Sequence, residues 1–219
     1  MKHISLLFGL FLFQVLPIKS QEIIINDSLS IEFLKTKETS KNFNTRSNVK
    51  VKGNEVKRIL TRCKVKALYD QPVDINAFSL VDTINKLRYR INEYIGYQAV
   101  SVMGSGYTSR MYLKKNLKNK KGKPYKGIPK YDASIKDSFE DFSIDGYTNV
   151  EVPIRFGTNR SLAGEFSGKK KEIISTVYYS PTQLDQFTTE IYFIVHNSFP
   201  ETHLELYYGN QLISEIKID

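Results

Sequence analysis

The chain has a single cysteine, Cys63, and no tryptophan among its 219 residues. One cysteine cannot form an internal disulfide, so the fold must be stabilised by a hydrophobic core rather than by cross-links. Much of that core must come from the 14 tyrosines and 13 phenylalanines. This aromatic content favours β-strands, because large rings pack well on a pleated sheet.

Long hydrophobic runs are also scarce: the only one spans residues 4–16. A membrane-spanning helix needs about 20 apolar residues, so this run is too short to be one. It follows a short basic start, ends at Pro17 and precedes the small residue Ser20, which is the layout of a secretory signal peptide. We therefore expect residues 1–20 to be a signal peptide cleaved near Ser20. The mature protein would then be secreted or periplasmic and would have no transmembrane span.

Strict alternation marks residues 58–70 as a long, half-buried strand. The face expected to be buried carries Ile59, Thr61, Cys63, Val65, Ala67 and Tyr69. The face expected to be outward and basic carries Arg58, Leu60, Arg62, Lys64, Lys66 and Leu68. Cys63 therefore acts as a small buried hydrophobe rather than as a reactive thiol.

Residues 75–90 fit two periodicities, a helical stripe and a pair of alternating strands. Several asparagines, serines and threonines make the segment a mediocre helix former, although Asp74 would cap a helix well. The neighbouring strand patterns decide in favour of a hairpin. We predict strands at 78–81 and 87–91 with a turn at 82–86.

Three more hairpins are expected from turn signals between alternating segments. Their turns fall at residues 104–106, at Asp145-Gly146 and at Gly209-Asn210. Single strands are expected at residues 172–180 and 187–196, and a mobile polar connection at residues 35–57. Eight to ten strands without a long helix indicate an antiparallel β-sandwich.

The order of these signals resembles a known type of domain. "GNEVKRI" leads into the long strand, "FSLVD" and "LRYRI" follow, and "IYFIVHNSF" and "LELYYG" come near the C-terminus. This pattern is similar to immunoglobulin-like domains of unknown function in bacterial secreted proteins and lipoproteins. The resemblance implies an all-β, immunoglobulin-like sandwich at residues 58–219, preceded by an N-terminal strand and polar connection at 21–57. It supplies no catalytic residues.

No enzyme signature survives inspection, and no cofactor is expected. Asp141, Ser143 and Asp145 match the first, third and fifth positions of a calcium-binding loop, with Gly146 at the sixth. The twelfth position is Val152 instead of the required glutamate, so a type I′ turn at Asp145-Gly146 is the favoured interpretation. The chain's remaining histidines, His196 and His203, match no common zinc spacing.

Acidic residues are missing from residues 114–130, which form the most basic segment of the chain. Its eight lysines are Lys114, Lys115, Lys118, Lys120, Lys121, Lys123, Lys126 and Lys130. Intervening glycines and prolines predict an irregular, exposed loop. Such a loop would bind an anionic glycan, a lipid headgroup or an envelope protein in a nonspecific, salt-sensitive way. The alternative is a solvated insertion without a ligand.

These observations favour an exported, non-catalytic protein that binds a ligand or serves as an accessory of the cell envelope. A hydrolase acting on envelope polymers is the alternative, since its site would be assembled from residues far apart in the sequence. No specific nucleic-acid motif is present.

Overall fold

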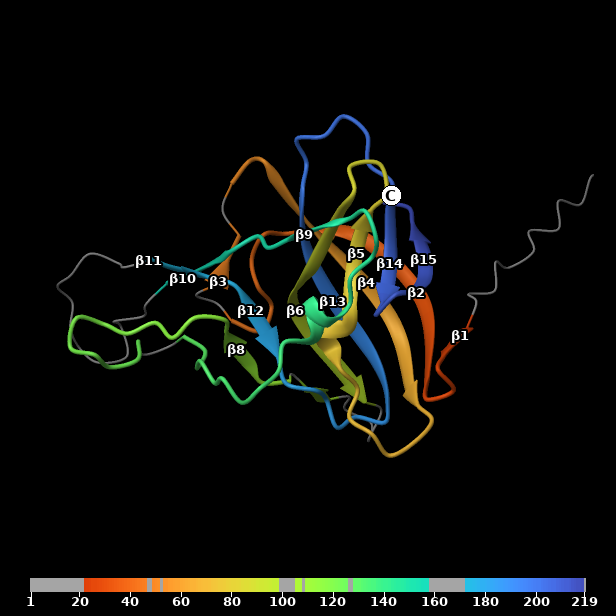
Figure 1. Ribbon diagram of the computed structural model, residues 1–219, viewed down its shortest axis with the longest axis horizontal. Coiled ribbons are helices and arrows are strands. Elements are labelled where there is room, and N and C mark those ends of the chain that lie inside the picture. Colours follow the sequence, from red (N-terminus) through yellow and green to blue (C-terminus); the bar gives the residue numbers. More distant parts are fainter. Residues whose placement is uncertain are drawn as a thin grey trace, which may run out of the picture.

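The computed structural model describes residues 22–46, 49–51, 53–98, 105–107, 109–125, 128–157 and 172–218. Its main element is a ten-stranded sheet with the path β1-β2-β4-β13-β6-β5-β14-β15 (Figure 1). These strands are β1 (Glu22–Ile25), β2 (Leu29–Thr39), β4 (Val56–Ala67), β13 (Gln186–His196), β6 (Leu87–Gln98), β5 (Phe78–Asp82), β14 (Leu204–Tyr208) and β15 (Gln211–Ile216). β7 (Ser105–Tyr107) and β9 (Thr148–Val150) pair with β6, and among the strand pairs of the described residues only β6–β9 is parallel.

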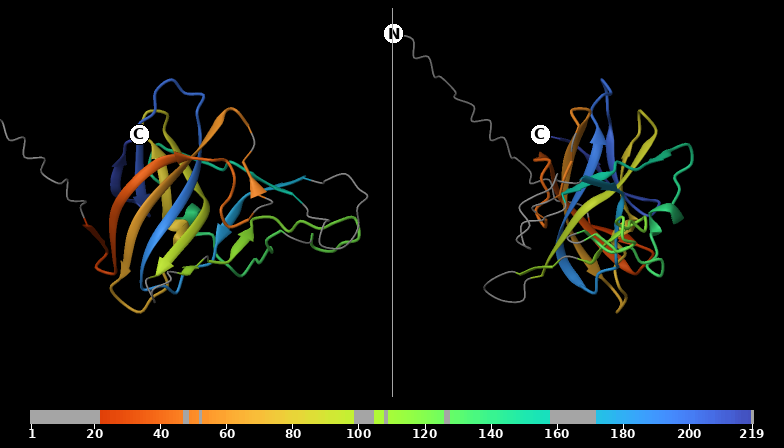
Figure 2. Two further views of the ribbon diagram at one scale, coloured as in Figure 1. Left: turned by 180° about the vertical axis from the view of Figure 1, so that it is seen from behind. Right: turned by 90° about the vertical axis from the view of Figure 1, so that its left-hand side faces the viewer.

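The sheet curls until its two ends approach each other, which gives it a barrel-like shape (Figure 2). β15 packs beside β2 without joining it through a strand pairing. The expected all-β, antiparallel class is confirmed by this arrangement. The immunoglobulin-like sandwich stays a prediction, because the principal strands belong to one continuous sheet.

Two small sheets extend from one end of the barrel. β10 (Ile154–Gly157) lies between β3 (Val49–Lys50) and β11 (Glu172–Ser175), and β8 (Met111–Leu113) pairs with β12 (Val177–Tyr179). The helical content of the described residues is two single-turn 3-10 helices, η1 (Ile75–Ala77) and η2 (Ser138–Asp141). No helix in this part of the chain has the length and apolar character to cross a membrane.

The ambiguous segment at residues 75–90 is a hairpin, as predicted. β5 and β6 pair in antiparallel register, with Leu80 opposite Tyr89. The Asp82 carboxylate closes the turn by accepting hydrogen bonds from the amides of Ile84 and Asn85, both at 3.1 Å. Leu80 is fully buried and Ile84 is 50% exposed, which excludes the helical alternative because a helix would bury both.

The inward face of β4 is confirmed for Ile59, Thr61, Cys63 and Val65, which are all buried. It is wrong for Tyr69, which is 62% exposed because β4 ends at Ala67. Burial raises the pKa of the Cys63 thiol, in keeping with an inert side chain. The outward face is only partly as expected, because Arg58 and Leu60 are buried as well. Arg58 is enclosed by the rings of Phe43 and Tyr192, whose centroids lie 4.9 and 4.0 Å from its guanidinium carbon.

The predicted hairpin at residues 139–156 is wrong. Its first half forms η2, and its second half supplies β9, which pairs in parallel with β6. The turn itself is present, since the Tyr147 amide donates to the Ile144 carbonyl at 3.1 Å. Positive φ occurs there at Gly146 (+80°) and not at Asp145, which is the pattern of a type II rather than a type I′ turn.

Other boundaries differ from expectation in smaller ways. β2 continues to Thr39, and Phe43, Val49 and Val51 are buried, so these parts of the polar connection pack on the core. The hairpin expected around residues 104–106 differs from the prediction, because Ser105 and Gly106 lie in β7, which pairs with β6. The next strand, β8, pairs with β12 instead. The hairpin at Gly209-Asn210 joins β14 to β15 as predicted. The expected signal peptide lies outside the described residues.

Candidate binding site: the lysine-rich arm

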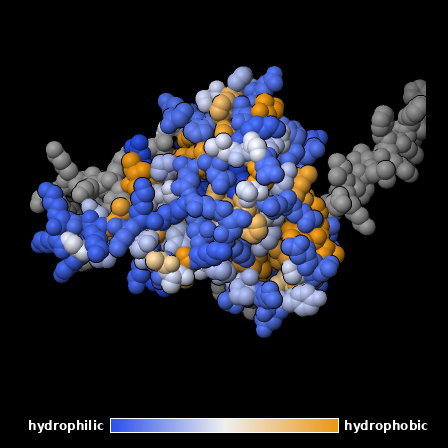
Figure 3. Space-filling model, in the orientation of Figure 1, coloured by the Kyte–Doolittle hydropathy of each residue, from blue (hydrophilic) through white to orange (hydrophobic). Residues whose placement is uncertain are grey.

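Residues 114–130, here called the lysine-rich arm, leave the barrel after β8 and return beside it. They project from the end of the molecule that carries the small sheets (Figure 1). In the space-filling view the arm forms a largely hydrophilic extension at the left (Figure 3). Of its eight lysines, Lys126 lies outside the described residues.

The base of the arm is fixed by backbone hydrogen bonds on both limbs. The Leu113 amide donates to the Lys130 carbonyl at 2.7 Å, which joins the outgoing limb to the returning one. The Lys114 amide donates to the Thr176 carbonyl at 3.1 Å, which joins the outgoing limb to the segment beside β12. The arm therefore begins and ends at one place on the fold.

The tip of the arm is a tight turn rather than an irregular excursion. The Asn119 amide donates to the Lys123 carbonyl at 2.8 Å, and the Gly122 amide donates to the Asn119 carbonyl at 2.9 Å. The Asn119 side-chain oxygen accepts from the Lys121 amide at 2.8 Å and from the Lys123 amide at 3.1 Å. Gly122 has φ +71°, so this is the three-residue hairpin loop in which a left-handed residue follows the turn.

Three apolar side chains connect the arm to the body of the protein. Leu117, Tyr125 and Ile128 are half-buried and pack against the main hydrophobic core. The tip between Asn119 and Lys123 has no apolar side chain of its own. The expectation of an irregular loop is thus corrected at two points, the tip and the base.

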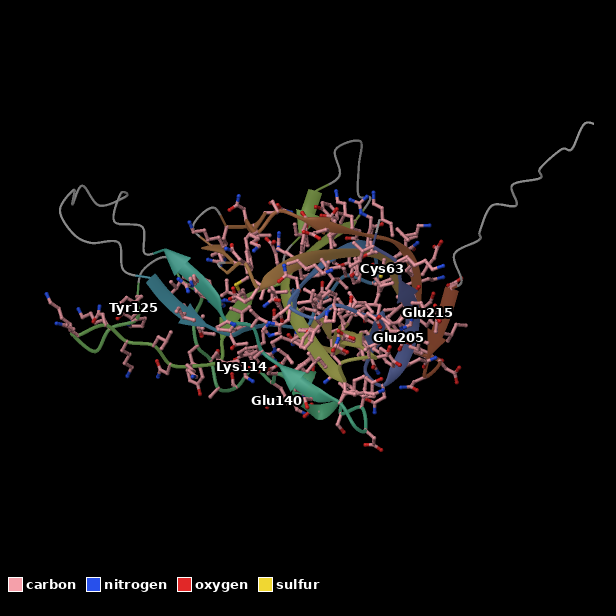
Figure 4. All side chains as sticks on the ribbon, turned by 90° about the horizontal axis from the view of Figure 1, so that it is seen from above. Cys63, Lys114, Tyr125, Glu140, Glu205 and Glu215 are labelled. Carbon is pink, nitrogen blue, oxygen red and sulfur yellow. The ribbon has the colours of Figure 1, made fainter. Side chains whose placement is uncertain are left out.

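Lys114 does not behave as a surface lysine. Its ammonium lies 2.5 Å from Glu140, 2.6 Å from Glu151 and 3.5 Å from Asp137, and its side chain is 22% exposed. Arg90 pairs with two of the same acids, at 2.5 Å from Asp137 and 3.3 Å from Glu151. Figure 4 shows Lys114 and Glu140 close together, with Tyr125 further out along the arm.

This network also sets the ionisation of its members. Burial disfavours the charged form of Lys114, but hydrogen bonds to Glu140 and Glu151 outweigh it and raise the pKa of the ammonium. Burial likewise opposes ionisation of Glu151, yet the hydrogen bond from Lys114 and the charge of Arg90 lower the pKa of its carboxyl. Lys114 thus fixes the arm in place and is not available to an external anion.

The remaining described lysines of the arm are free to meet a ligand. Lys115, Lys118, Lys120, Lys121, Lys123 and Lys130 are all exposed. Within the part of the chain that the structure describes, none of the six forms an ion pair with a carboxylate. The arm therefore presents six positive charges on a short, anchored segment without an acid of its own.

The calcium site at Asp141, Ser143 and Asp145 stays a prediction. Asp141 ends η2 and pairs with Lys136 at 2.6 Å, while Ser143 and Asp145 are exposed beyond it. The acids that do gather are Asp137, Glu140 and Glu151, whose ligand atoms all lie within 4.8 Å of one another. That spacing suits a cation, and the cations at this position are the side chains of Lys114 and Arg90.

Sequence reasoning missed the residues that hold the arm. Asp137, Glu140 and Glu151 are far from Lys114 in the chain, and no spacing rule links them. A weaker signal was present in the arm itself, where Leu117 and Ile128 interrupt the lysines as isolated apolar residues. Such residues in a charged segment indicate a contact with the core.

Comparison with known proteins adds no relative from which a site could be transferred. No family model, no curated protein and no solved structure matches the chain.

Proposed function

We propose that this protein is a non-catalytic binding protein whose lysine-rich arm holds an anionic polysaccharide. The observation that carries the proposal is the set of six exposed, unpaired lysines on an anchored arm. We further propose, from the sequence, that the protein is exported and that its fold is immunoglobulin-like. The binding chemistry requires neither of them.

The shape of the arm favours a polysaccharide over a membrane. Stable attachment to lipid takes a buried apolar group in addition to basic charge. Here the apolar residues Leu117, Tyr125 and Ile128 pack toward the core, and the tip has none to insert. A single-stranded nucleic acid is disfavoured for a related reason, since the tip lacks aromatic rings on which bases would stack.

Lysine also determines the kind of binding. An ammonium is a strongly hydrated point charge without the planar fork of arginine, so it attracts sulfate and carboxylate groups without fixing their orientation. We therefore expect binding that depends on charge density more than on the identity of the sugar. Exposed charges are screened beyond about 8 Å at physiological ionic strength, so binding should weaken steeply as salt rises.

The test is elution from immobilised heparin in a sodium chloride gradient. The arm variant carries Lys118→Gln, Lys120→Gln, Lys121→Gln and Lys123→Gln. The control variant carries the same substitutions at four exposed lysines outside the arm, namely Lys35, Lys37, Lys66 and Lys217. Both variants lose four charges, so any difference between them reports position rather than net charge.

The arm variant should elute at clearly lower salt than the control, which should stay near the wild type. Equal elution of the two variants would refute the proposal, because net charge alone would then explain retention. A parallel experiment measures binding to vesicles that contain phosphatidylserine. Retention on these vesicles without retention on heparin would assign the arm to a lipid surface instead.

The hydrolase alternative needs a pair of carboxylates free to act on a substrate. Among the described residues, the gathered acids Asp137, Glu140 and Glu151 are engaged by Lys114 and Arg90. This observation favours the binding proposal over hydrolysis.

A further inference from the structure

A concave cleft of about 400 Å³ lies between the two limbs of the lysine-rich arm. Leu113 and Leu117 line it from the outgoing limb, and Ile128, Pro129 and Tyr131 line it from the returning limb. Small-molecule sites in proteins have volumes of about 300–1,000 Å³ and are lined mainly by apolar side chains with a few polar groups. The cleft meets both conditions.

The polar groups of the lining are few and carry no negative charge. Asn116 and Lys130 contribute an exposed amide and an exposed ammonium, and Tyr125 and Tyr131 contribute one phenolic hydroxyl each. The first acid beyond the arm is Asp132, whose carboxylate already accepts hydrogen bonds from the Ser134 amide at 3.0 Å and hydroxyl at 2.6 Å. These bonds, aided by the charges of Arg110 and Lys130, lower the pKa of Asp132.

We infer that this cleft binds an amphipathic monoanion, a carboxylate attached to a single acyl chain. The chain would lie against Leu117, Ile128 and Tyr131, and the carboxylate would meet the ammonium of Lys130. The arm itself adds no repulsion of a carboxylate, because residues 114–130 contain no acid.

A sugar ring fits the same cleft less well. Each hydroxyl removed from water needs a hydrogen-bond partner, and an unpaired one is costly. The lining offers four polar side chains, from Asn116, Tyr125, Lys130 and Tyr131, which do not satisfy all the hydroxyls and the ring oxygen of a sugar, whereas an acyl chain makes no such demand. The inference does not rest on the polysaccharide proposal, which uses the tip of the arm rather than the cleft at its base.

The test is calorimetric titration of the whole protein with dodecanoate below its micelle concentration. Each methylene buried in an apolar site improves affinity about fourfold, so decanoate, which has two methylenes fewer, should bind roughly fifteenfold more weakly than dodecanoate. Dodecanol and dodecyltrimethylammonium should bind at least fivefold more weakly than dodecanoate, because they lack the negative head group. Absence of saturable dodecanoate binding, or equal binding of dodecanol, would overturn the inference.

Substitutions in the cleft have matched controls elsewhere on the surface. Tyr131→Ala removes a wall residue that is 41% exposed, and Tyr69→Ala removes a tyrosine that is 62% exposed beyond the end of β4. Lys130→Gln removes the head-group partner, and Lys66→Gln removes an exposed lysine of β4. The cleft variants should weaken dodecanoate binding at least fivefold, and the controls less than twofold.

Equal losses in a cleft variant and its control would place the binding outside the cleft and refute the inference. Unchanged far-ultraviolet circular dichroism verifies that each variant is folded. The four-lysine arm variant should elute from heparin at clearly lower salt than its control and keep its dodecanoate affinity within twofold. Heparin elution therefore tests the polysaccharide proposal, and dodecanoate titration tests the cleft, each independently of the other.

Discussion

Replacing Lys114 with glutamine tests whether this residue anchors the arm. The ammonium is the shared partner of Glu140, Glu151 and Asp137, so its removal leaves three close carboxylates with Arg90 as their remaining cation. A hydrogen bond to a charged group contributes about 1.5–3 kcal/mol to stability. Glu140 is 61% exposed and Glu151 is 32% exposed, so solvent weakens both interactions. We expect a loss of about 2 kcal/mol in the free energy of unfolding at pH 7.

The loss should depend on pH in a direction that follows from the two pKa shifts. The pKa of Glu151 is lower in the folded state than its ordinary value of 4.5, so its contribution is present above that value and disappears as pH falls through the folded-state pKa. The pKa of Lys114 is raised above 10.5, so its contribution is present below that value and disappears as pH rises through the folded-state pKa. The difference between wild type and variant should be largest between these limits and shrink on both sides.

The measurement is urea-induced unfolding followed by far-ultraviolet circular dichroism at acidic, neutral and alkaline pH. Lys115→Gln is the matched control, because its exposed neighbouring ammonium has no carboxylate partner among the described residues and should change stability by less than about 0.5 kcal/mol. On heparin, Lys114→Gln should elute with the distant single variant Lys66→Gln. A loss below about 0.5 kcal/mol for Lys114→Gln at pH 7, or a loss that is constant across pH, would contradict the anchoring role.

Three further substitutions test the fold by the same unfolding measurement. Leu80→Ala should cost about 2–5 kcal/mol because Leu80 is fully buried, whereas Ile84→Asp should cost less than about 0.5 kcal/mol at an exposed turn; equal large losses would overturn the hairpin. Glu93→Gln should cost about 3–5 kcal/mol, because it leaves the fully buried guanidinium of Arg58 without its carboxylate partner. A cost below about 1 kcal/mol would show that Arg58 finds another partner or reaches water.

Local patterns predicted the elements whose partners lie close in the sequence. The β5–β6 and β14–β15 hairpins were found because alternation and turn residues occur within the same short window. The Asp82 carboxylate that closes the first turn is itself a turn-forming residue of that window. Long strands such as β4 and β13 were predicted for the same reason, since a period of two over ten residues is a strong signal.

Elements that depend on distant partners were not predictable in this way. The segment that forms η2 alternates like a strand, but Arg88 of β6 donates hydrogen bonds to the carbonyls of Phe139 and Phe142 and so holds a different backbone path. Arg58 alternates with outward residues, but Glu93 of another strand compensates its charge in the interior. Arg58 follows the rule that a buried charge is paired, whereas the buried guanidinium of Arg88 donates to neutral oxygens of other segments. The sequence does not name the partners of either arginine.

The lysine-rich arm contains residues of both kinds, those predictable from the local sequence and those that depend on distant partners. Composition correctly predicted that the six described lysines without an ion pair are exposed, because charged side chains stay in water unless they are paired. Lys114 belongs to the same run and differs only in the carboxylates that η2 and Glu151 bring to it through the tertiary fold. A glycine that suggested irregularity, Gly122, instead allows the left-handed conformation that closes the tip. Which lysines can bind a ligand is therefore decided by the contacts of the arm with the barrel rather than by the number of lysines in it.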